Sequence, residues 1–540
     1  MSLTDTAATV PQDEPNQPEE PEVPWRRLSV RMLAVHPVRE VLRAWPVLIG
    51  LVVVGTSGGR NPLWSLGGLG VVVVLGLSRW FTTAYRVSER QVQVKQGLVR
   101  RQVLTVPRDR VRTVDITASP LHRVLGLARV TVGTGRSDRQ NDGIKLDALT
   151  TAEADQLRTD LLRRTAVAAT DTSPDLAPPT ETVLARLHPG WLRYGPFTLS
   201  GVLTVLVVAG FLQRLINEAD IKVSRFGPLK SATNQLARTA LPVAVLEVLL
   251  ACAVLVAIFS TAGYIVAFWG FRLTRQSGGT LRISRGLLTS RTITIEERRL
   301  RGVELSEPLL LRAVGGARCI AIATGLRVGR GAERGGSMLL PPAPRAEAVR
   351  VAGVVLAEAI PATAQSGPAT PAAEPTGGRG AISVALHRHG SRARLRRYTR
   401  ALVGAAVVPA VLTVLWGVAG WPGWAVALSL LLVPIAVLLA ADRYRNLGHA
   451  LSGAAFVVSQ GSLVRRRCVL SRDAIIGWNL RQSFFQRRAG LVTMVATTAA
   501  GRQRYEALDL PARDAVRLAD DTVPGLLTPF LVPLGTEHTR

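Results

Sequence analysis

The sequence predicts a membrane protein with six transmembrane α-helices in three hairpins, together with three small β-sandwich or barrel domains, each capped by a C-terminal helix. Two observations lead to this prediction. The chain of 540 residues is unusually apolar, with 47% hydrophobic residues and a mean hydropathy of +0.23. A pattern of alternating apolar and basic residues also occurs three times, each time after a pair of long uncharged stretches.

The repeated pattern aligns without a gap in its three copies. These read KQGLVRRQVLTVPRDRVRTVDI at 95–116, SRGLLTSRTITIEERRLRGVEL at 284–305 and SQGSLVRRRCVLSRDAIIGWNL at 459–480. A second glycine follows the first at the same distance in every copy, in the pairs Gly97 and Gly126, Gly286 and Gly315, Gly461 and Gly490. The copies lie much farther apart than the units of a solenoid, so each is expected to be a small domain with its own core.

Long uncharged segments supply the predicted spans. They are residues 44–59, 61–78, 195–213, 248–270 and 401–441. A hydrocarbon core of about 30 Å needs about 20 helical residues, so the last segment holds two spans that turn at GWPGW, residues 420–424. The total is six. The alternative of long buried hairpins in a soluble protein is disfavoured because three such pairs occur.

These features divide the chain into alternating parts. The predicted order is a disordered tail and basic lead-in (1–43), hairpin 1 (44–80), domain 1 (85–164), a linker (165–194), hairpin 2 (195–270), domain 2 (271–359), a linker with a basic juxtamembrane segment (360–400), hairpin 3 (401–441), domain 3 (443–521) and a tail (522–540). Both linkers are rich in Pro, Ala, Ser and Thr, which is typical of flexible connections.

Each domain is expected to consist of antiparallel strands followed by a helix. In the first copy, strands are predicted at VQVK, VLTV, VRTVDIT, ARVTVGT and GIKLDAL, and an amphipathic helix over 152–164. The glycine-rich GTGRSDRQNDG at 133–143 is interpreted as a hairpin loop rather than a phosphate-binding loop. The third copy begins with NLGHALSGAAF, so it is expected to lack a clean first strand.

This order of elements resembles the bacterial pleckstrin-homology-like (PH-like) domain. The residues that carry the resemblance are G-L with a following hydrophobic residue and Arg, then V-P, a strand, a short helical turn ending in L-G, and a strand ending in T-G. The resemblance covers residues 85–164, 271–359 and 450–521. It implies a domain that often occurs beside paired transmembrane helices and, loosely, a role in envelope maintenance or in resistance to antimicrobial peptides. The third copy departs from the pattern with Leu470-Ser471 in place of Val106-Pro107.

The net charge of +28 is interpreted as a membrane signature. Lys and Arg accumulate in cytoplasmic segments and are attracted to the anionic inner leaflet. Nucleic-acid binding is not predicted, because the interleaved aromatic residues of a stacking platform are missing. Both termini and all three domains are expected to be cytoplasmic because basic residues precede the first span, namely Arg26, Arg27, Arg31, Arg39 and Arg43. The basic residues of the second return loop, residues 214–238, oppose this orientation.

Basic residues near the bilayer are the candidate lipid- or partner-binding groups. Those around the repeat glycines are Arg100, Arg101, Arg291, Arg465, Arg466 and Arg467, and those in the juxtamembrane run are Arg394, Arg396 and Arg397. The alternative for the first group is an exposed strand face that protects an edge from aggregation. Glu247, inside a predicted span, is a candidate intramembrane group, unless it lies near the outer end of its helix where interfacial water reaches it.

No catalytic, metal or cofactor motif is found. The three cysteines are scattered, the seven histidines lack metal-ligand spacing, and His387 and His389 are expected to be solvated. The sequence therefore predicts a non-enzymatic membrane scaffold whose partners are anionic lipids and another membrane protein, with a homo-oligomer left open. The alternative is a six-helix transporter or lipid-translocating protein. Polar groups facing one another between spans would favour the transporter, and packing through Gly, Ala and Ser would favour simple anchoring.

Overall fold

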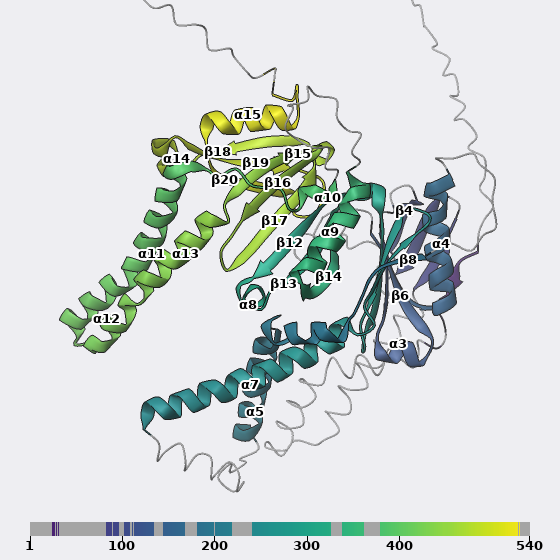
Figure 1. Cartoon of the computed structure of the whole chain (residues 1–540). Helices are drawn as coiled ribbons and strands as arrows, with labels where there is room; N and C mark the ends of the chain where they lie inside the picture. The colour runs from purple at the N-terminus through teal and green to yellow at the C-terminus, as the bar shows by residue number, and fades with distance from the viewer. Residues whose placement is uncertain are drawn as a thin grey trace, which may run out of the picture. The chain divides into compact units, whose positions relative to one another are not determined.

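The computed structural model of the chain (Figure 1) describes residues 24–27, 29, 31, 83–88, 90–96, 102–108, 111, 113–133, 144–167, 181–198, 200–218, 240–325, 337–360, 378–527 and 529. The predicted first hairpin (44–80), Arg100 and Arg101 lie outside these residues, as does nearly all of the predicted loop 133–143. The chain forms two compact units, Met1–Asp109 and Arg110–Arg540.

The first unit contains a four-stranded antiparallel sheet in the order β1-β2-β3-β4. Its strands are β1 (Arg26–Arg27), β2 (Ala84–Val87), β3 (Gln91–Gln96) and β4 (Gln102–Pro107). The alternating residues of the sequence pattern produce two different faces, because Val92, Val94 and Val106 are buried whereas Thr105 is exposed. The segments VQVK and VLTV therefore form strands, as the sequence pattern predicts.

The second unit begins with the rest of the first repeat. Its elements are β5 (Thr113–Ala118), α3 (Pro120–Val124), β6 (Leu127–Gly133), β7 (Ile144–Thr150) and α4 (Thr151–Val167). The predicted strands and the closing helix are therefore present. Ala154, Leu157 and Leu161 of α4 are buried, which places the amphipathic face of the helix on the protein core.

The second repeat lies wholly in this unit. Before its strands come β8 (Glu181–Arg186), the 3-10 helices η2 (Pro189–Tyr194) and η3 (Pro196–Thr198), and the long helices α5 (Ser200–Glu218) and α7 (Leu241–Phe268). The domain itself is built from β9 (Arg272–Gln276), β10 (Thr280–Arg285), β11 (Ser290–Glu296), η5 (Glu297–Arg299), β12 (Leu300–Pro308), α8 (Leu309–Ala313), β13 (Gly316–Ala323), β14 (Ser337–Pro344) and α9 (Arg345–Ala359). Residues 181–194 thus belong to β8 and η2, not to the flexible linker that composition indicated, because Trp191 and Tyr194 anchor them in the core.

The third repeat follows the same plan. Its helices and strands are α10 (Gly378–Ala381), α11 (Gly390–Ala419), α12 (Gly423–Leu430), α13 (Leu432–Arg445), β15 (Gly448–Ser452), β16 (Ala455–Gln460), β17 (Val464–Ser471), η7 (Arg472–Ala474), β18 (Gly477–Arg481), α14 (Phe484–Ala489), β19 (Leu491–Thr497), β20 (Arg504–Pro511) and α15 (Ala512–Thr522). The expectation that this copy lacks a clean first strand is wrong. β15 pairs fully with β16, because Gly453 takes a φ of +54° in the connecting turn.

Neighbouring repeats share their sheets. The order β7-β6-β5-β11-β10-β9-β8 joins the first repeat to the second, and the order β14-β13-β12-β17-β16-β15 joins the second to the third. The cores also cross this boundary, since Ile322 of β13 lies among the buried residues of the third domain. The last strands form a separate sheet, β18-β19-β20. The repeats of this unit are therefore not independent domains; they form a continuous array joined by shared sheets.

Backbone geometry explains the two repeated glycines. Gly286 and Gly461 have φ values of +111° and +100°, and an added Cβ would lie 2.0 Å from a carbonyl oxygen of the same hairpin in both cases. Gly126, Gly315 and Gly490 follow the short helices with φ between +65° and +71°. The left-handed conformation at the end of a helix favours glycine. The spacing between the two glycines is therefore the spacing between a hairpin turn and a helix end.

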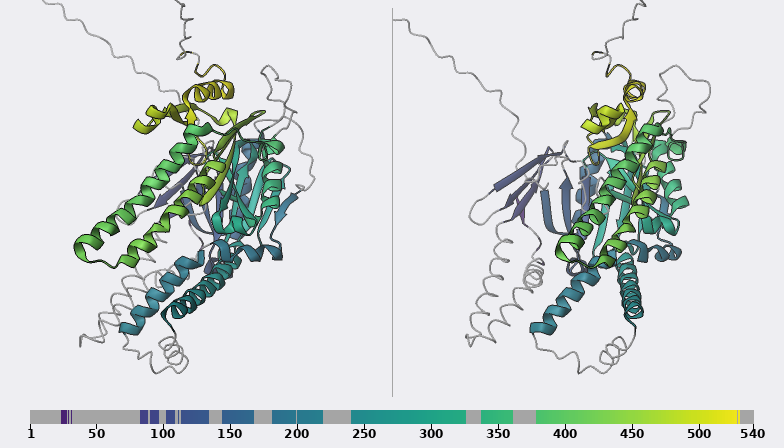
Figure 2. Two further views of the ribbon diagram at one scale, coloured as in Figure 1. Left: turned by 60° about the vertical axis from the view of Figure 1, so that its left-hand side comes forward. Right: turned by 90° about the vertical axis from the view of Figure 1, so that its left-hand side faces the viewer.

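Three described helices are long and apolar enough to cross a bilayer: Leu241–Phe268, Gly390–Ala419 and the nearly continuous Gly423–Arg445. Only 6% to 11% of their most apolar windows is buried by protein. So much exposed apolar surface is typical of a membrane environment. The helix pair α11 and α12–α13 turns at the predicted GWPGW motif, and α12 ends at Leu430 because Pro434 lacks the N–H that would bond to it. Figure 2 shows α11 and α13 side by side.

Candidate functional site

Strand pairing brings the two ends of both described helix pairs together. Arg186 of β8, before α5, pairs with Arg272 of β9, after α7, and Leu187 N donates to Phe271 O at 3.0 Å. In the third repeat His387 and His449 form the equivalent antiparallel bridge. The chain therefore leaves and re-enters its domain at neighbouring strands. This arrangement holds the domain ends of these helices directly against the domain.

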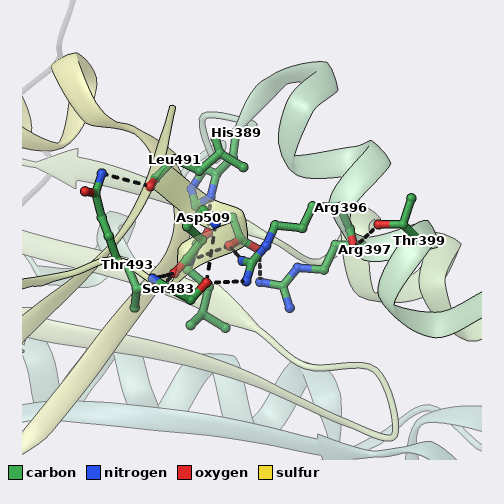
Figure 3. Close-up of polar contacts among 11 residues, drawn as sticks. His389, Arg396, Arg397, Thr399, Ser483, Leu491, Thr493 and Asp509 are labelled. Carbon is green, nitrogen blue, oxygen red and sulfur yellow. Dashed lines mark hydrogen bonds and ion pairs between the residues drawn. The ribbon is translucent and has the colours of Figure 1, made fainter. Parts of the chain in front are cut away.

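A buried carboxylate fixes the third helix pair to its domain. Asp509 of β20 is 1% exposed and forms ion pairs with Arg396 and Arg397 on α11, the second at 2.6 Å (Figure 3). Gln486 of α14 donates to the same carboxylate at 2.7 Å, and Arg396 also donates to Ser483 at 3.2 Å. Strand β20 and the N-terminal end of α14 thus hold the first turns of α11.

The same junction encloses a basic pocket of about 390 Å³. It is lined by Arg397, Arg400, Arg443, Leu447, Gln460, Gly461, Val464, Arg466, Glu506 and Leu508. Arg397 and Arg400 come from α11, Arg443 from the end of α13, and Arg466 from β17. The lining therefore contains four guanidinium groups and one carboxylate, that of Glu506. The uncharged segment of α11 begins directly after Arg400, so the pocket lies at the domain end of this apolar segment.

The four arginines are not equivalent. Arg397 is held by Asp509, and Arg466 lies 3.7 Å from Glu304. Among the described residues, Arg400 and Arg443 have no ion-pair partner. Guanidinium groups bind phosphate oxygens with charge-assisted and often bidentate hydrogen bonds. Among the lining arginines of the described pocket, Arg400 and Arg443 are therefore the two that are available to an anionic group.

Most other arginines singled out in the sequence form contacts within the protein. Arg291 is paired with Asp115 at 2.9 Å, Arg465 with Asp442, and Arg467 donates to the Val384 carbonyl. Arg394 lines a second depression, of about 540 Å³, beside Leu395 and Tyr398. Glu247 is exposed in the second turn of α7. Of the sequence candidates, the structure thus brings Arg397 and Arg466 together in the pocket. It adds Arg400 and Arg443, which the sequence could have indicated because each lies next to an uncharged span.

A pair of histidines, buried His389 and half-buried His449, also lies at this junction, and the expectation that His389 is solvated is wrong. His389 is buried, its Nδ1 lies 2.7 Å from the Leu508 carbonyl, and its Nε2 lies 3.0 Å from Nδ1 of His449. Because the carbonyl can only accept, His389 Nδ1 must donate, so neutral His389 accepts from His449. Residue type alone gives no signal for such a pair, because its burial depends on strands far apart in the sequence.

Acid is therefore expected to weaken the junction. Burial and the neighbouring His389 and His387 lower the pKa of His449 to about 4, and burial also lowers the pKa of His389. Unfolded histidine titrates near 6.5, so the stabilisation is complete above pH 6.5 and is lost as the pH falls toward 4, by up to about 3 kcal/mol. The melting temperature of the full chain in detergent should decrease over this window. If the double variant His389→Gln, His449→Gln shows an equal decrease, the assignment is incorrect.

The described residues contain no cluster of His, Cys, Asp and Glu that could hold a metal ion. Their architecture is that of a repeated β domain, closed by a helix and attached to apolar helices. A sequence profile described as the bacterial PH domain matches residues 30–165, 231–358 and 401–521, which is more than half of the chain. The chain therefore belongs to the bacterial PH domain family and contains three PH-like repeats, as its sequence predicts. Comparison with curated proteins and with solved structures gives no match.

Proposed function

We propose that this protein is a non-enzymatic membrane scaffold whose PH-like domains bind anionic headgroups at the cytoplasmic surface. The observation that carries the proposal is the basic pocket at the base of α11 and α13, where Arg400 and Arg443 face one cavity without an ion-pair partner among the described residues. Each basic group near an anionic surface contributes about 1 kcal/mol of attraction. An acidic segment of a second membrane protein could bind the same arginines, and the tests below distinguish it from a lipid.

The packing of α5 against α7 favours anchoring over transport. An added Cβ on Gly201 of α5 would lie 2.3 Å from the Val256 carbonyl of α7, so the two backbones are in close contact there. Ser260 of α7 donates to the Gly195 carbonyl at 2.8 Å and lies 2.8 Å from Thr198. Close contacts between small residues are the signature of static helix packing. Glu247, exposed on α7, does not take part in this contact.

Lipid binding by the pocket is tested by native mass spectrometry of the full chain titrated with phosphatidylglycerol or with phosphatidylethanolamine. The variant Arg400→Gln, Arg443→Gln should lose up to about 2 kcal/mol of affinity for the anionic lipid, roughly thirtyfold, and little for the zwitterionic lipid. The control Arg513→Gln, Arg517→Gln removes the same charge from the exposed side of α15. Equal losses in both variants, or none in the first, would refute the headgroup site.

The proposed orientation places all three repeats in the cytoplasm. Its support is the row of arginines before the first predicted span and the strand pairing that returns the chain to its domain after each described helix pair. Reporter fusions after residues 164, 359 and 540 should all give the cytoplasmic signal. A single external signal would contradict the orientation.

A further inference from the structure

The two joints between repeats have the same register. At the first joint Ile116 of β5 pairs with Thr292 of β11, and at the second Leu305 of β12 pairs with Arg467 of β17. In the gapless alignment of the repeats, Ile116 is equivalent to Leu305, and Thr292 is equivalent to Arg467. The joint is therefore a repeated structural feature with a fixed geometry, formed between the fifth-strand position of one repeat and the fourth-strand position of the next.

Each end of the chain carries one unused half of this joint. Among the described strands, β4 of the first repeat, which is equivalent to β11 and β17, pairs with β3 alone. In the same way β18 of the third repeat, which is equivalent to β5 and β12, pairs with β19 alone. Within the described residues both strands are sheet edges, and an edge strand can pair with another strand. Figure 1 shows β6 and β18 on opposite sides of the second unit, with the β12–β17 joint between them.

Side chains that are buried in the formed joints are exposed at the equivalent positions of the two unpaired edges, as expected for an interface whose partner strand is absent. Thr294 and Val469 are 2% and 0% exposed inside the two formed joints, whereas the equivalent Thr105 of β4 is exposed. Two large apolar side chains also face solvent, Val103 of β4 at 54% and Leu480 of β18 at 44%. The common register places these two directly opposite one another, where cross-strand apolar pairs stabilise a sheet.

The polar groups of the two edges are complementary as well. Both formed joints contain an Arg and an acid on the same face, Arg291 with Asp115 at 2.9 Å and Arg466 with Glu304 at 3.7 Å. At the unused edges the equivalent positions are occupied by Gln102 and Asn479, so a neutral amide pair replaces the ion pair and no charge would be buried without a partner.

One buried donor on β18 points to the same partner. The indole Nε1 of Trp478 is buried and has no hydrogen-bond partner among the described residues. Trp478 is equivalent to Val114, which pairs with Thr294, so an incoming β4 places the Thr105 hydroxyl opposite the indole. A hydroxyl oxygen can accept from an indole N–H.

We propose that β18 of one copy of this chain pairs with β4 of a second copy, in the register of the internal joints. The interface is heterologous, so repeated pairing generates rings or open rows of PH-like domains along the membrane. This assembly goes beyond lipid binding and does not depend on it, because neither strand contributes Arg400 or Arg443. The two complementary halves are on the same chain, which makes the chain itself the partner that fits both edges.

The test is disulfide cross-linking between differently tagged full-length chains in native membranes, in a Cys252→Ser background. Residues opposite one another in an antiparallel pair have Cα atoms about 4.5 to 5.5 Å apart, within reach of a disulfide. A chain with Val103→Cys and a chain with Leu480→Cys should form a heterodimer on mild oxidation. Pairing Val103→Cys with Arg481→Cys, one residue out of register and on the opposite face, should give little product.

A further variant separates assembly from folding. Thr105 is exposed, so Thr105→Lys should fold normally, but it places a charge at a position that is buried in both formed joints. The yield of the cross-linked heterodimer should fall at least about tenfold. The proposal is overturned if no heterodimer forms, if the register has no effect, or if a chain carrying both cysteines gives only an internal disulfide.

Discussion

Replacing Asp509 with Asn is expected to release α11 from the third domain at a cost of about 3–5 kcal/mol. The variant keeps the size of the side chain but leaves the guanidinium groups of Arg396 and Arg397 close together without their counter-charge. Arg397 is buried, so water cannot replace the lost interaction. Hydrogen exchange at the start of α11 and along β20 should accelerate in the full chain.

Two further variants make this prediction specific. Asp473→Asn removes an exposed carboxylate from the same domain and should change exchange very little. Combining Arg397→Met with Asp509→Asn should cost less than the sum of the two changes, because the residues interact directly. Additive effects, or an Asp509→Asn protein with normal protection of α11, would show that the carboxylate does not hold the junction.

Replacing Glu304 with Gln is expected to open the joint between the second and third repeats. Glu304 is 1% exposed, both of its oxygens accept from Arg502 at 2.6 Å, and Arg466 lies across the joint. Burial raises the pKa of Glu304 although these arginines oppose the shift, so desolvation offsets part of the attraction. We therefore expect the variant to lose about 3 kcal/mol of stability at this joint, near the lower end of the range for breaking a buried ion pair.

The loss should be localised. Backbone amides of β12 and β17 should exchange faster, whereas those of β9 and β10, on the other sheet of the second domain, should not change. Glu358→Gln provides the control, because Glu358 is largely exposed and its pairing with Arg275 at 3.6 Å contributes little. Uniform acceleration across the second domain would mean that Glu304 supports the domain core instead of the joint.

Much of the fold could be predicted from periodicity. Alternating residues located β3 to β7, amphipathic spacing located α4, and the recurrence of two glycines identified three copies of one domain. These signals are local. Alternating residues show which side of a strand is buried, and a recurring glycine marks a backbone conformation that other residues rarely adopt. The family follows from the same local order of elements.

The sharing of sheets between repeats could not be predicted. Arg291 and Asp115 lie far apart in the sequence, and nothing in either segment indicates that the two strands pair. For this reason, only some of the basic residues selected from the sequence line the pocket. Arg291 and Arg465 form ion pairs inside the protein, whereas Arg443 enters the pocket because α13 returns beside α11. Net charge reflects the number of arginines in the chain, but it does not show which of them lack an ion-pair partner in the folded protein.

The most direct measurement is photo-cross-linking from position 464 in living cells. Val464 lines the basic pocket between α11, α13 and β17, so a photoreactive residue at this position samples whatever occupies it in the native membrane. We expect a lipid adduct whose mass identifies a phosphate-bearing anionic headgroup, and we expect Arg400→Gln, Arg443→Gln to abolish it. Adducts formed only with protein, or a lipid adduct that both substitutions leave unchanged, would contradict the assignment of the pocket as a headgroup site.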